Sequence, residues 1–123
     1  MDEINGLTEQ IIEAAIEVHR HLGPGLLAVA HEEALAPELQ LRRVPFARQV
    51  AVPFVYNGHP IGDYRLDLLV GDSVIVEIES VERHDPVFEA QLLTYLRLTG
   101  KRAGLPINLN TRLLRQGVKR LIL

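Results

Sequence analysis

Apolar residues recur at helical spacing in the first third of the chain. Between Leu7 and Leu22 they stand at steps of three and four residues, the spacing of an amphipathic helix with one buried stripe. The Gly23–Gly25 segment, with proline at its centre, is predicted to end this helix. A second helix is predicted from about Leu26 to Leu41. Pro37 inside it should cost about 3 kcal/mol unless the helix kinks or restarts there.

The pattern changes to alternating and β-branched residues between Phe46 and Glu79. Two turn dipeptides interrupt this stretch, Asn57-Gly58 and Gly71-Asp72. Dipeptides of this kind join neighbouring antiparallel strands. We therefore predict a three-stranded antiparallel meander.

The remaining third of the chain is predicted to hold one helix and two strands. Asp85 is a typical N-cap, and Gly100 is typical of a helix C-terminus, which predicts a helix over Pro86–Thr99. Strands are then expected near residues 103–109 and 118–122. Pro106 in the first of these strands indicates a sheet edge or a bulge.

The bulk composition fits one compact domain. At 123 residues the chain has room for one hydrophobic core, so we predict a single domain over residues 1–123. The element order predicts an α/β fold with a central mixed sheet of about four or five strands flanked by helices. The absence of cysteine excludes disulfides, thiolate zinc sites and cysteine nucleophiles. No apolar stretch approaches the roughly 20 residues that span a bilayer, so we expect no membrane contact and a cytoplasmic location.

Charge is distributed unevenly along the chain, although the net value is −3. All sixteen acidic residues lie at or before Glu89. The residues from Ala90 onward include seven basic residues and no acid: Arg97, Lys101, Arg102, Arg112, Arg115, Lys119 and Arg120. This basic C-terminal third is either a surface for a nucleic-acid backbone or a solvated face. The apolar end, Leu121–Leu123, predicts a homo-oligomer.

Three carboxylates in the meander are candidates for chemistry. Glu77 and Glu79 point to the same face of the third strand because strand side chains alternate. A short turn separates this strand from the one that carries Asp67, so Asp67 can meet Glu77 across the ladder. Such a cluster is either spread into solvent or neutralised by a hard cation such as Mg²⁺ or Mn²⁺.

The order Asp67, then Glu77-x-Glu79, then Gln91-x-x-x-Tyr95 on a helix resembles the PD-(D/E)XK nuclease superfamily, in particular its RecB-like branch. The phrases GDYRLDLLV and EAQLLTYLRLTG, with GPGLL and GVKR, more narrowly resemble the small bacterial GxxExxY proteins. This resemblance covers nearly the whole chain. It implies a restriction-endonuclease-like core.

The resemblance also implies a metal-dependent phosphodiesterase. In such a site Asp67 and Glu77 would hold Mg²⁺ or Mn²⁺. Gln91 and Tyr95 would line the site or contact the phosphate backbone, or else they pack their helix against the sheet. The lysine that usually follows the motif glutamate by two residues is Glu79 here. Glu79 is therefore either a member of the catalytic set or a solvated strand residue.

Two further positions depart from the naming signature of the GxxExxY proteins. Ala28 stands where the signature has glutamate, and His31 stands where it has tyrosine. Glu32, one helical turn after Ala28, could replace the missing glutamate as a third metal ligand. We therefore predict a nuclease-like protein with weakened or lost cleavage activity. The alternative is a non-catalytic homo-oligomeric assembly module or nucleic-acid-binding module on the same scaffold.

Overall fold

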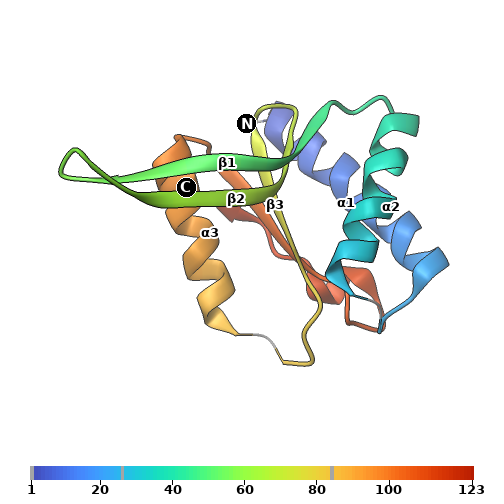
Figure 1. Ribbon diagram of the computed structural model, residues 1–123. Coiled ribbons are helices and arrows are strands. Elements are labelled where there is room, and N and C mark those ends of the chain that lie inside the picture. Colours follow the sequence, from blue (N-terminus) through green and yellow to red (C-terminus); the bar gives the residue numbers. More distant parts are fainter. Residues whose placement is uncertain (1, 26, 84) are drawn as a thin grey trace.

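The computed structural model describes residues 2–25, 27–83 and 85–123, and its elements follow the predicted order (Figure 1). The predicted first residue of the second helix, Leu26, lies outside the described residues. A short 3₁₀ helix, η1, is the one element in this range that the sequence pattern does not predict. The elements are α1 (Asp2–Leu22), α2 (Ala28–Leu41), β1 (Phe46–Tyr56), β2 (His59–Val70), β3 (Val74–Glu79), α3 (Pro86–Thr99), β4 (Ala103–Asn108), η1 (Leu114–Gly117) and β5 (Leu121–Ile122).

The strands form one mixed sheet in the order β1-β2-β3-β4-β5. The pairs β1–β2 and β2–β3 are antiparallel, which confirms the predicted meander. β4 runs parallel to β3, and α3 makes the crossover between them. β5 pairs antiparallel with the first two residues of β4. The predicted α/β fold with a mixed sheet and flanking helices is therefore confirmed.

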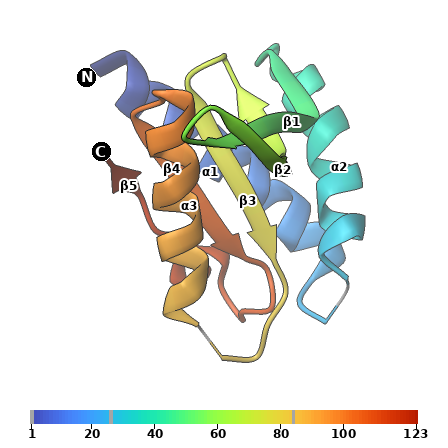
Figure 2. The same cartoon turned by 60° about the vertical axis from the view of Figure 1, so that its left-hand side comes forward.

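Helices cover the two faces of the sheet (Figure 2). α1 and α2 pack on one face, where Ile11, Leu35 and Leu39 meet Val74 and Val76 in the larger apolar core. α3 packs on the other face and forms a second, smaller core. Its buried members are Val52, Leu66, Ile75, Leu92, Tyr95 and Leu96. Successive residues of β3 thus point alternately toward the helix pair and toward α3.

Local signals explain where α3 begins and ends. The Asp85 side chain accepts a hydrogen bond from the backbone N–H of Val87 at 3.0 Å, as an N-cap should. Gly100 has a φ of 73°, the left-handed conformation that closes helices at little cost for glycine. The predicted bounds, Pro86–Thr99, are therefore confirmed.

The longest helix, α1, is amphipathic. Ile11, Ala15 and Val18 are almost completely buried, whereas Glu3 and Glu13 are exposed. Across the described ranges, no helix is both long and apolar enough to cross a membrane. The cytoplasmic location of the protein stays a prediction.

Two prolines lie inside regular elements for different reasons. Pro37 sits on the exposed side of α2, so water can bond the backbone carbonyl that its missing N–H leaves unpaired. The backbone oxygen of Pro106 points toward the β5 side, where it accepts a hydrogen bond from the backbone N–H of Lys119. The nitrogen of a strand residue points to the same edge as its oxygen, so Pro106 removes no ladder bond to β3. The sheet edge that Pro106 predicts is thus the side of β4 that β5 covers only in part.

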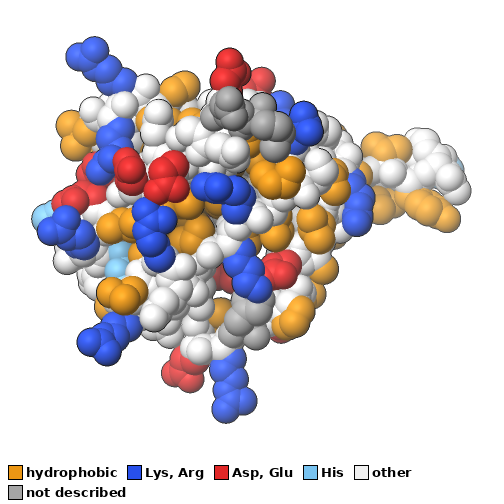
Figure 3. Space-filling view, turned by 180° about the vertical axis from the view of Figure 1, so that it is seen from behind, with side chains coloured by type: hydrophobic (Ala, Val, Ile, Leu, Met, Phe, Trp, Pro, Cys, Tyr) orange, Lys and Arg blue, Asp and Glu red, His pale blue; other side chains and the backbone are white. Residues whose placement is uncertain are grey.

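The β1–β2 ribbon extends beyond the rest of the sheet (Figures 1 and 3). β3 pairs with residues 68–70 of β2. The adjoining part of the ribbon packs against α3 through Val52 and Leu66, and its tip stands away from the body. Its turn is the predicted Asn57-Gly58, with φ values of 49° and 80° that fit a tight hairpin. The exposed apolar side chains near its tip include Val55, Tyr56 and Ile61.

We expect Gly117→Ala to destabilise the fold. Gly117 ends η1, and a Cβ atom at this position would overlap the backbone oxygen of Asn108 at the end of β4. The backbone must therefore shift, and we expect a loss of about 1 to 3 kcal/mol in the free energy of unfolding, measured by urea denaturation.

Gly6→Ala in α1 is the matched control, because nothing lies within 4 Å of a Cβ atom there. Alanine favours the helix more than glycine does, so stability should rise by about 0.5 to 1 kcal/mol. If the two substitutions changed the free energy of unfolding equally, the close contact between η1 and the end of β4 would be contradicted.

Candidate functional site

Asp67 and Glu77 lie side by side on neighbouring strands. The β2–β3 ladder pairs Leu68 with Val76, which makes Asp67 and Glu77 the next residues along the two strands. Oδ2 of Asp67 accepts a hydrogen bond from the backbone N–H of Ile78 at 2.8 Å. The carboxyl groups of Asp67 and Glu77 are also within hydrogen-bonding reach of each other. The structure thus brings together the two carboxylates that the sequence singles out.

The pair faces α3. Ile75, which belongs to the core under α3, shares its side of β3 with Glu77 and Glu79 because strand side chains alternate. Val76 and Ile78 point the other way, into the core under α1 and α2. The acidic groups are therefore on the less extensively packed face, where a partly open site can form.

β2 changes direction at Asp67. Leu68 packs in the core under α1 and α2, whereas Leu66 packs in the core under α3. Opposite Asp67 on β1 stands Gln49, which has a φ of 51°, while Arg48 and Val50 on either side pair in register with Leu68 and Leu66. The ladder to β3 also ends here. Asp67 therefore lies where the ribbon leaves the sheet, and its side chain is on the α3 side.

Burial and mutual repulsion shape the electrostatics of Glu77. Burial, followed by the charge of Asp67, raises the pKa of Glu77 from 4.5 to about 9. Its Oε1 atom is buried and receives no hydrogen bond. At neutral pH the pair therefore shares one proton or, in place of that proton, binds a cation.

Glu79 belongs to the same patch. Burial raises its pKa from 4.5 to about 7, and the charges of Asp67 and Glu89 add to the effect. The influence of Glu89 is informative, because this residue comes from α3 and not from the meander. Glu79 is thus a half-buried member of an acidic patch that consists of Asp67, Glu77, Glu79 and Glu89.

Gln91 and Tyr95 stand on α3 above this patch. The Nε2 atom of Gln91 donates a hydrogen bond to the hydroxyl of Tyr95 at 2.8 Å, as residues one helical turn apart can do. Burial and the charge of Glu77 raise the pKa of Tyr95. The ring of Tyr64 from β2 lies 6.0 Å from that of Tyr95, centroid to centroid. Tyr95 and Tyr64 therefore form an aromatic wall beside the carboxylates.

Glu32, the third predicted metal ligand, takes part in other contacts. Its carboxylate is buried on α2, where Arg48 donates to Oε2 at 2.8 Å and Gln49 donates to Oε1 at 3.0 Å. Both oxygens are therefore already occupied. Within residues 2–25, 27–83 and 85–123, no group of three or more His, Cys, Asp or Glu side chains is arranged to hold a metal ion. The predicted ligand set of Asp67, Glu77 and Glu32 stays a prediction, and the contacts of Glu32 with Arg48 and Gln49 do not favour it.

The contacts of Glu32 and its neighbour His31 are structural. Glu32 holds Gln49, the residue of β1 that stands opposite Asp67, and so supports the bend of the ribbon. His31 is almost fully buried, and its Nε2 lies 3.1 Å from the backbone oxygen of Gly23. His31, which departs from the signature, thus connects α2 to the residue that follows α1.

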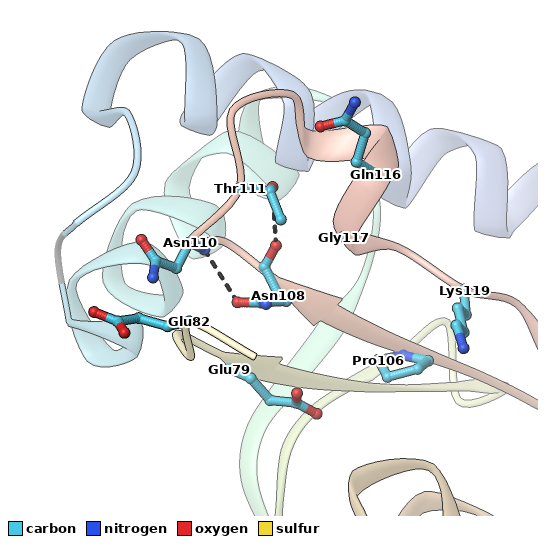
Figure 4. Close-up of a pocket in the computed structure, with 9 residues that line it drawn as sticks. All are labelled: Glu79, Glu82, Pro106, Asn108, Asn110, Thr111, Gln116, Gly117 and Lys119. Carbon is cyan, nitrogen blue, oxygen red and sulfur yellow. Dashed lines mark hydrogen bonds between the residues drawn. The ribbon is translucent and has the colours of Figure 1, made fainter. Parts of the chain in front are cut away.

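A hollow adjoins the acidic patch at the carboxyl ends of the parallel strands β3 and β4, a common place for ligands in α/β sheets (Figure 4). Its volume is about 340 Å³. Its lining includes Glu79, Glu82, Asn108, Asn110, Gln116 and Lys119. Asn108 is held by its side-chain bonds to the backbone of Val81, so the hollow has a fixed floor.

Sequence reasoning missed Glu89 and Lys119, which form an ion pair next to Glu79. Glu89 comes just before the Gln91-x-x-x-Tyr95 motif, and Lys119 belongs to the phrase GVKR. Both phrases contribute to the family resemblance. Sequence spacing alone, however, does not predict that α3 and the C-terminal segment meet at this patch.

The metal-free protein should lose stability as pH rises. The unfolded chain releases the Glu77 proton near pH 4.5, whereas the folded chain keeps it to about pH 9. This contribution is therefore complete below pH 4.5 and is lost progressively up to pH 9. With chelator present, Glu77→Gln should stabilise the protein at pH 8 relative to pH 5 by about 1 to 3 kcal/mol in urea denaturation.

Glu3→Gln is the control for this pH experiment, since Glu3 is exposed on α1. It should leave the difference between pH 5 and pH 8 as in the wild type. The buried carboxyl pair would be contradicted if the free energy of unfolding of the wild type rose steadily from pH 5 to pH 8 and Glu77→Gln did not change that slope.

Glu32→Gln should destabilise the protein whether or not metal is present. The substitution leaves Arg48 without its nearest carboxylate, and we expect a loss of about 1.5 to 3 kcal/mol. Denaturation in Mn²⁺ and in chelator should give the same loss. A loss seen in Mn²⁺ alone would support Glu32 as a metal ligand.

One comparison identifies the family. The chain matches the model of the PD-(D/E)XK nuclease superfamily over residues 5–121. No curated protein and no solved structure gives a significant match. The matched range includes both carboxylate strands, the crossover helix α3 and the C-terminal segment that carries Lys119. The fold, the paired carboxylates and this match agree, and the chain belongs to the PD-(D/E)XK nuclease superfamily.

Proposed function

We propose that this protein is a metal-dependent nuclease that hydrolyses phosphodiester bonds slowly. The observation that carries the proposal is the Oε1 atom of Glu77, which is buried beside Asp67 and receives no hydrogen bond. An unsatisfied anionic oxygen next to a second carboxylate is unfavourable unless a proton or a cation joins the pair. Superfamily membership favours the cation.

The two carboxylates fit Mg²⁺ or Mn²⁺ without a third acidic ligand. Mg²⁺ usually keeps several waters and takes one or two carboxylates from the protein, the remaining ligands coming from substrate phosphate. Asp67 and Glu77 can supply those carboxylates. A cation bound there would lower the pKa of a coordinated water and polarise a phosphate oxygen.

The surrounding residues orient the substrate and restrict water. Tyr95 is buried and closes one side of the pair, and its hydroxyl is fixed by Gln91. Tyr64 offers a partly exposed ring near the same point, on which a sugar or base could rest. The hydroxyl of Tyr95 and the amide of Gln91 can donate to phosphate oxygens.

Glu79 explains why cleavage should be slow. A carboxylate at this position repels the phosphate dianion that forms as the bond to the leaving oxygen breaks. The residue usual at this position in the resembled motif is lysine, which has the opposite charge. This supports the prediction of weakened activity over that of complete loss, because Asp67 and Glu77 are intact.

Nucleic acid is the proposed substrate, and its backbone would meet a surface of mixed charge. Four residues of the basic C-terminal third are ion-paired: Lys101 with Asp72, Lys119 with Glu89, and Arg115 and Arg120 with Glu9. Blue and red side chains are accordingly interspersed in Figure 3. The exposed residues Arg97, Arg102 and Arg112 are the better candidates for phosphate contacts.

Two finer assignments stay predictions within this proposal. The resemblance to GxxExxY proteins depends on the phrases GDYRLDLLV and EAQLLTYLRLTG, which lie on β2 and α3 at the site. A homo-oligomer is supported by the exposed side chains of Ile122 and Leu123. Sedimentation analysis would decide the oligomeric state independently of cleavage.

The central experiment is cleavage of labelled single-stranded DNA, double-stranded DNA and RNA by pure protein with Mg²⁺ or Mn²⁺. We expect cutting that stops in chelator and falls by about 100-fold or more in Asp67→Asn, because that substitution removes one of two metal-binding carboxylates. Calorimetric titration with Mn²⁺ should show one site that Asp67→Asn weakens. Glu79→Lys should increase the cutting rate by about tenfold or more, since it reverses an unfavourable charge.

Asp63→Asn is the matched control, because Asp63 is an exposed aspartate on the same strand. It should cut and bind Mn²⁺ as the wild type does. Wild-type protein that neither cuts any substrate nor binds Mn²⁺ would overturn the proposal and favour the non-catalytic assembly or binding module.

A further inference from the structure

Lys119 lies beside the acidic patch, where its ammonium forms an ion pair with Glu89. The other recorded ion pairs of basic residues in the C-terminal third are made with Asp72 on a turn or Glu9 on α1. A site that handles a phosphate needs a positive group to offset its charge. Lys119 is therefore of particular interest.

Sheet geometry places Lys119 in line with Glu77. Pro106 on β4 is the register partner of Glu77 on β3. Lys119 donates its backbone N–H to Pro106 at 3.3 Å and lies between the pairs Gly104–Leu121 and Ile107–Val118. Register partners share a face, so Glu77, Pro106 and Lys119 form a row on the α3 side.

The length of this row suits a lysine. Two strand spacings separate the backbones of Glu77 and Lys119, about 10 Å. An extended lysine side chain carries Nζ about 6 Å from its Cα. Pro106, which stands between them, has a short ring that leaves the path open. Nζ can therefore cover more than half of this distance and meet a phosphate oxygen held between the two residues.

The observed position of Lys119 agrees with this path. Its Nζ pairs with Oε1 of Glu89, the α3 residue whose charge also acts on Glu79. Lys119 and Glu79 both line the hollow at the ends of β3 and β4 (Figure 4). The side chain of Lys119 is 56% exposed and that of Glu89 is 26% exposed. The ion pair thus holds the ammonium at the rim of the site while leaving it free to shift toward a substrate.

We propose that Lys119 supplies the phosphate-binding cation of this site, in place of the group that Glu79 cannot provide. The assignment rests on the proposed nuclease function. Nζ of Lys119 donates to a non-bridging phosphate oxygen and offsets the negative charge that grows during hydrolysis. Glu89 is a positioning residue that keeps the ammonium near the hollow. The positively charged side chain thus comes from the C-terminal segment instead of from β3.

The test compares Lys119→Gln with Arg120→Gln, a neighbouring basic residue that pairs with Glu9 on α1. Lys119→Gln should lower the cleavage rate by about 30-fold or more. It should leave Mn²⁺ affinity and the melting temperature close to wild type, because an exposed ion pair contributes little to stability. Arg120→Gln should stay within about threefold of the wild-type rate.

A second lysine should rescue the first. Glu79→Lys should therefore speed cutting by a larger factor in the Lys119→Gln background than in the wild-type background, by about tenfold more, because the new ammonium replaces the missing one at the same site. A purely structural role for Lys119 predicts equal gains in the two backgrounds. Lys119→Gln that cuts like the wild type would overturn the assignment while leaving the proposed nuclease function intact.

Substrate binding decides the assignment even if no variant cuts. Fluorescence anisotropy with a labelled 12-mer of single-stranded DNA in Ca²⁺ should show weaker binding by Lys119→Gln, by about fivefold or more, and unchanged binding by Arg120→Gln. Equal losses in the two variants would indicate general surface charge and overturn the role of Lys119. Absence of metal-dependent cutting in wild-type protein that still shows the specific binding loss would overturn the nuclease proposal alone.

Discussion

The feature on which the site depends is the enforced proximity of two carboxyl groups. Asp67 and Glu77 cannot separate, because the β2–β3 ladder fixes their backbones next to each other and the Ile78 N–H holds the Asp67 side chain. α3 then covers part of the pair and limits its contact with water, which raises the pKa of Glu77 to about 9. The fold keeps an unfavourable arrangement in place because the apolar contacts of two cores surround it. A proton relieves the repulsion in the free protein, and a divalent cation can do so in its place.

The bend at Asp67 shows how distant parts of the fold contribute to this arrangement. Gln49 takes a left-handed backbone conformation that costs a non-glycine residue about 1 kcal/mol or more. Its side-chain amide is held by Glu32, and its backbone oxygen accepts from Arg65 at 3.1 Å. α2 thus acts on Asp67 through the strand between them. This gives Glu32 a structural importance that differs from the ligand role its sequence position suggests.

The sequence predicts the elements of this fold well because most of its signals are local. Turn dipeptides mark the meander, and Asp85 and Gly100 mark both ends of α3. The proximity of Asp67 and Glu77 is predictable too, since one short turn sets their register. The partners of Glu32 are not predictable, because they depend on how α2 packs across β1. The position of Lys119 depends on the path from β4 through η1, an element that the apolar pattern does not reveal.

Pro106 connects the edge of the sheet with the chemistry of the site. Its missing N–H faces the side of β4 where β5 has nearly ended, so the sheet loses no bond to β3. A longer side chain at this position would stand on the α3 face between Glu77 and Lys119, since the three residues share one row. The proline ring instead leaves space there and borders the hollow. Four carboxylates and one lysine remain an acidic combination even when Glu89 is paired. The charge of the patch would therefore favour the proposed divalent cation at Asp67 and Glu77, and the open row would let the lysine approach a phosphate at that site.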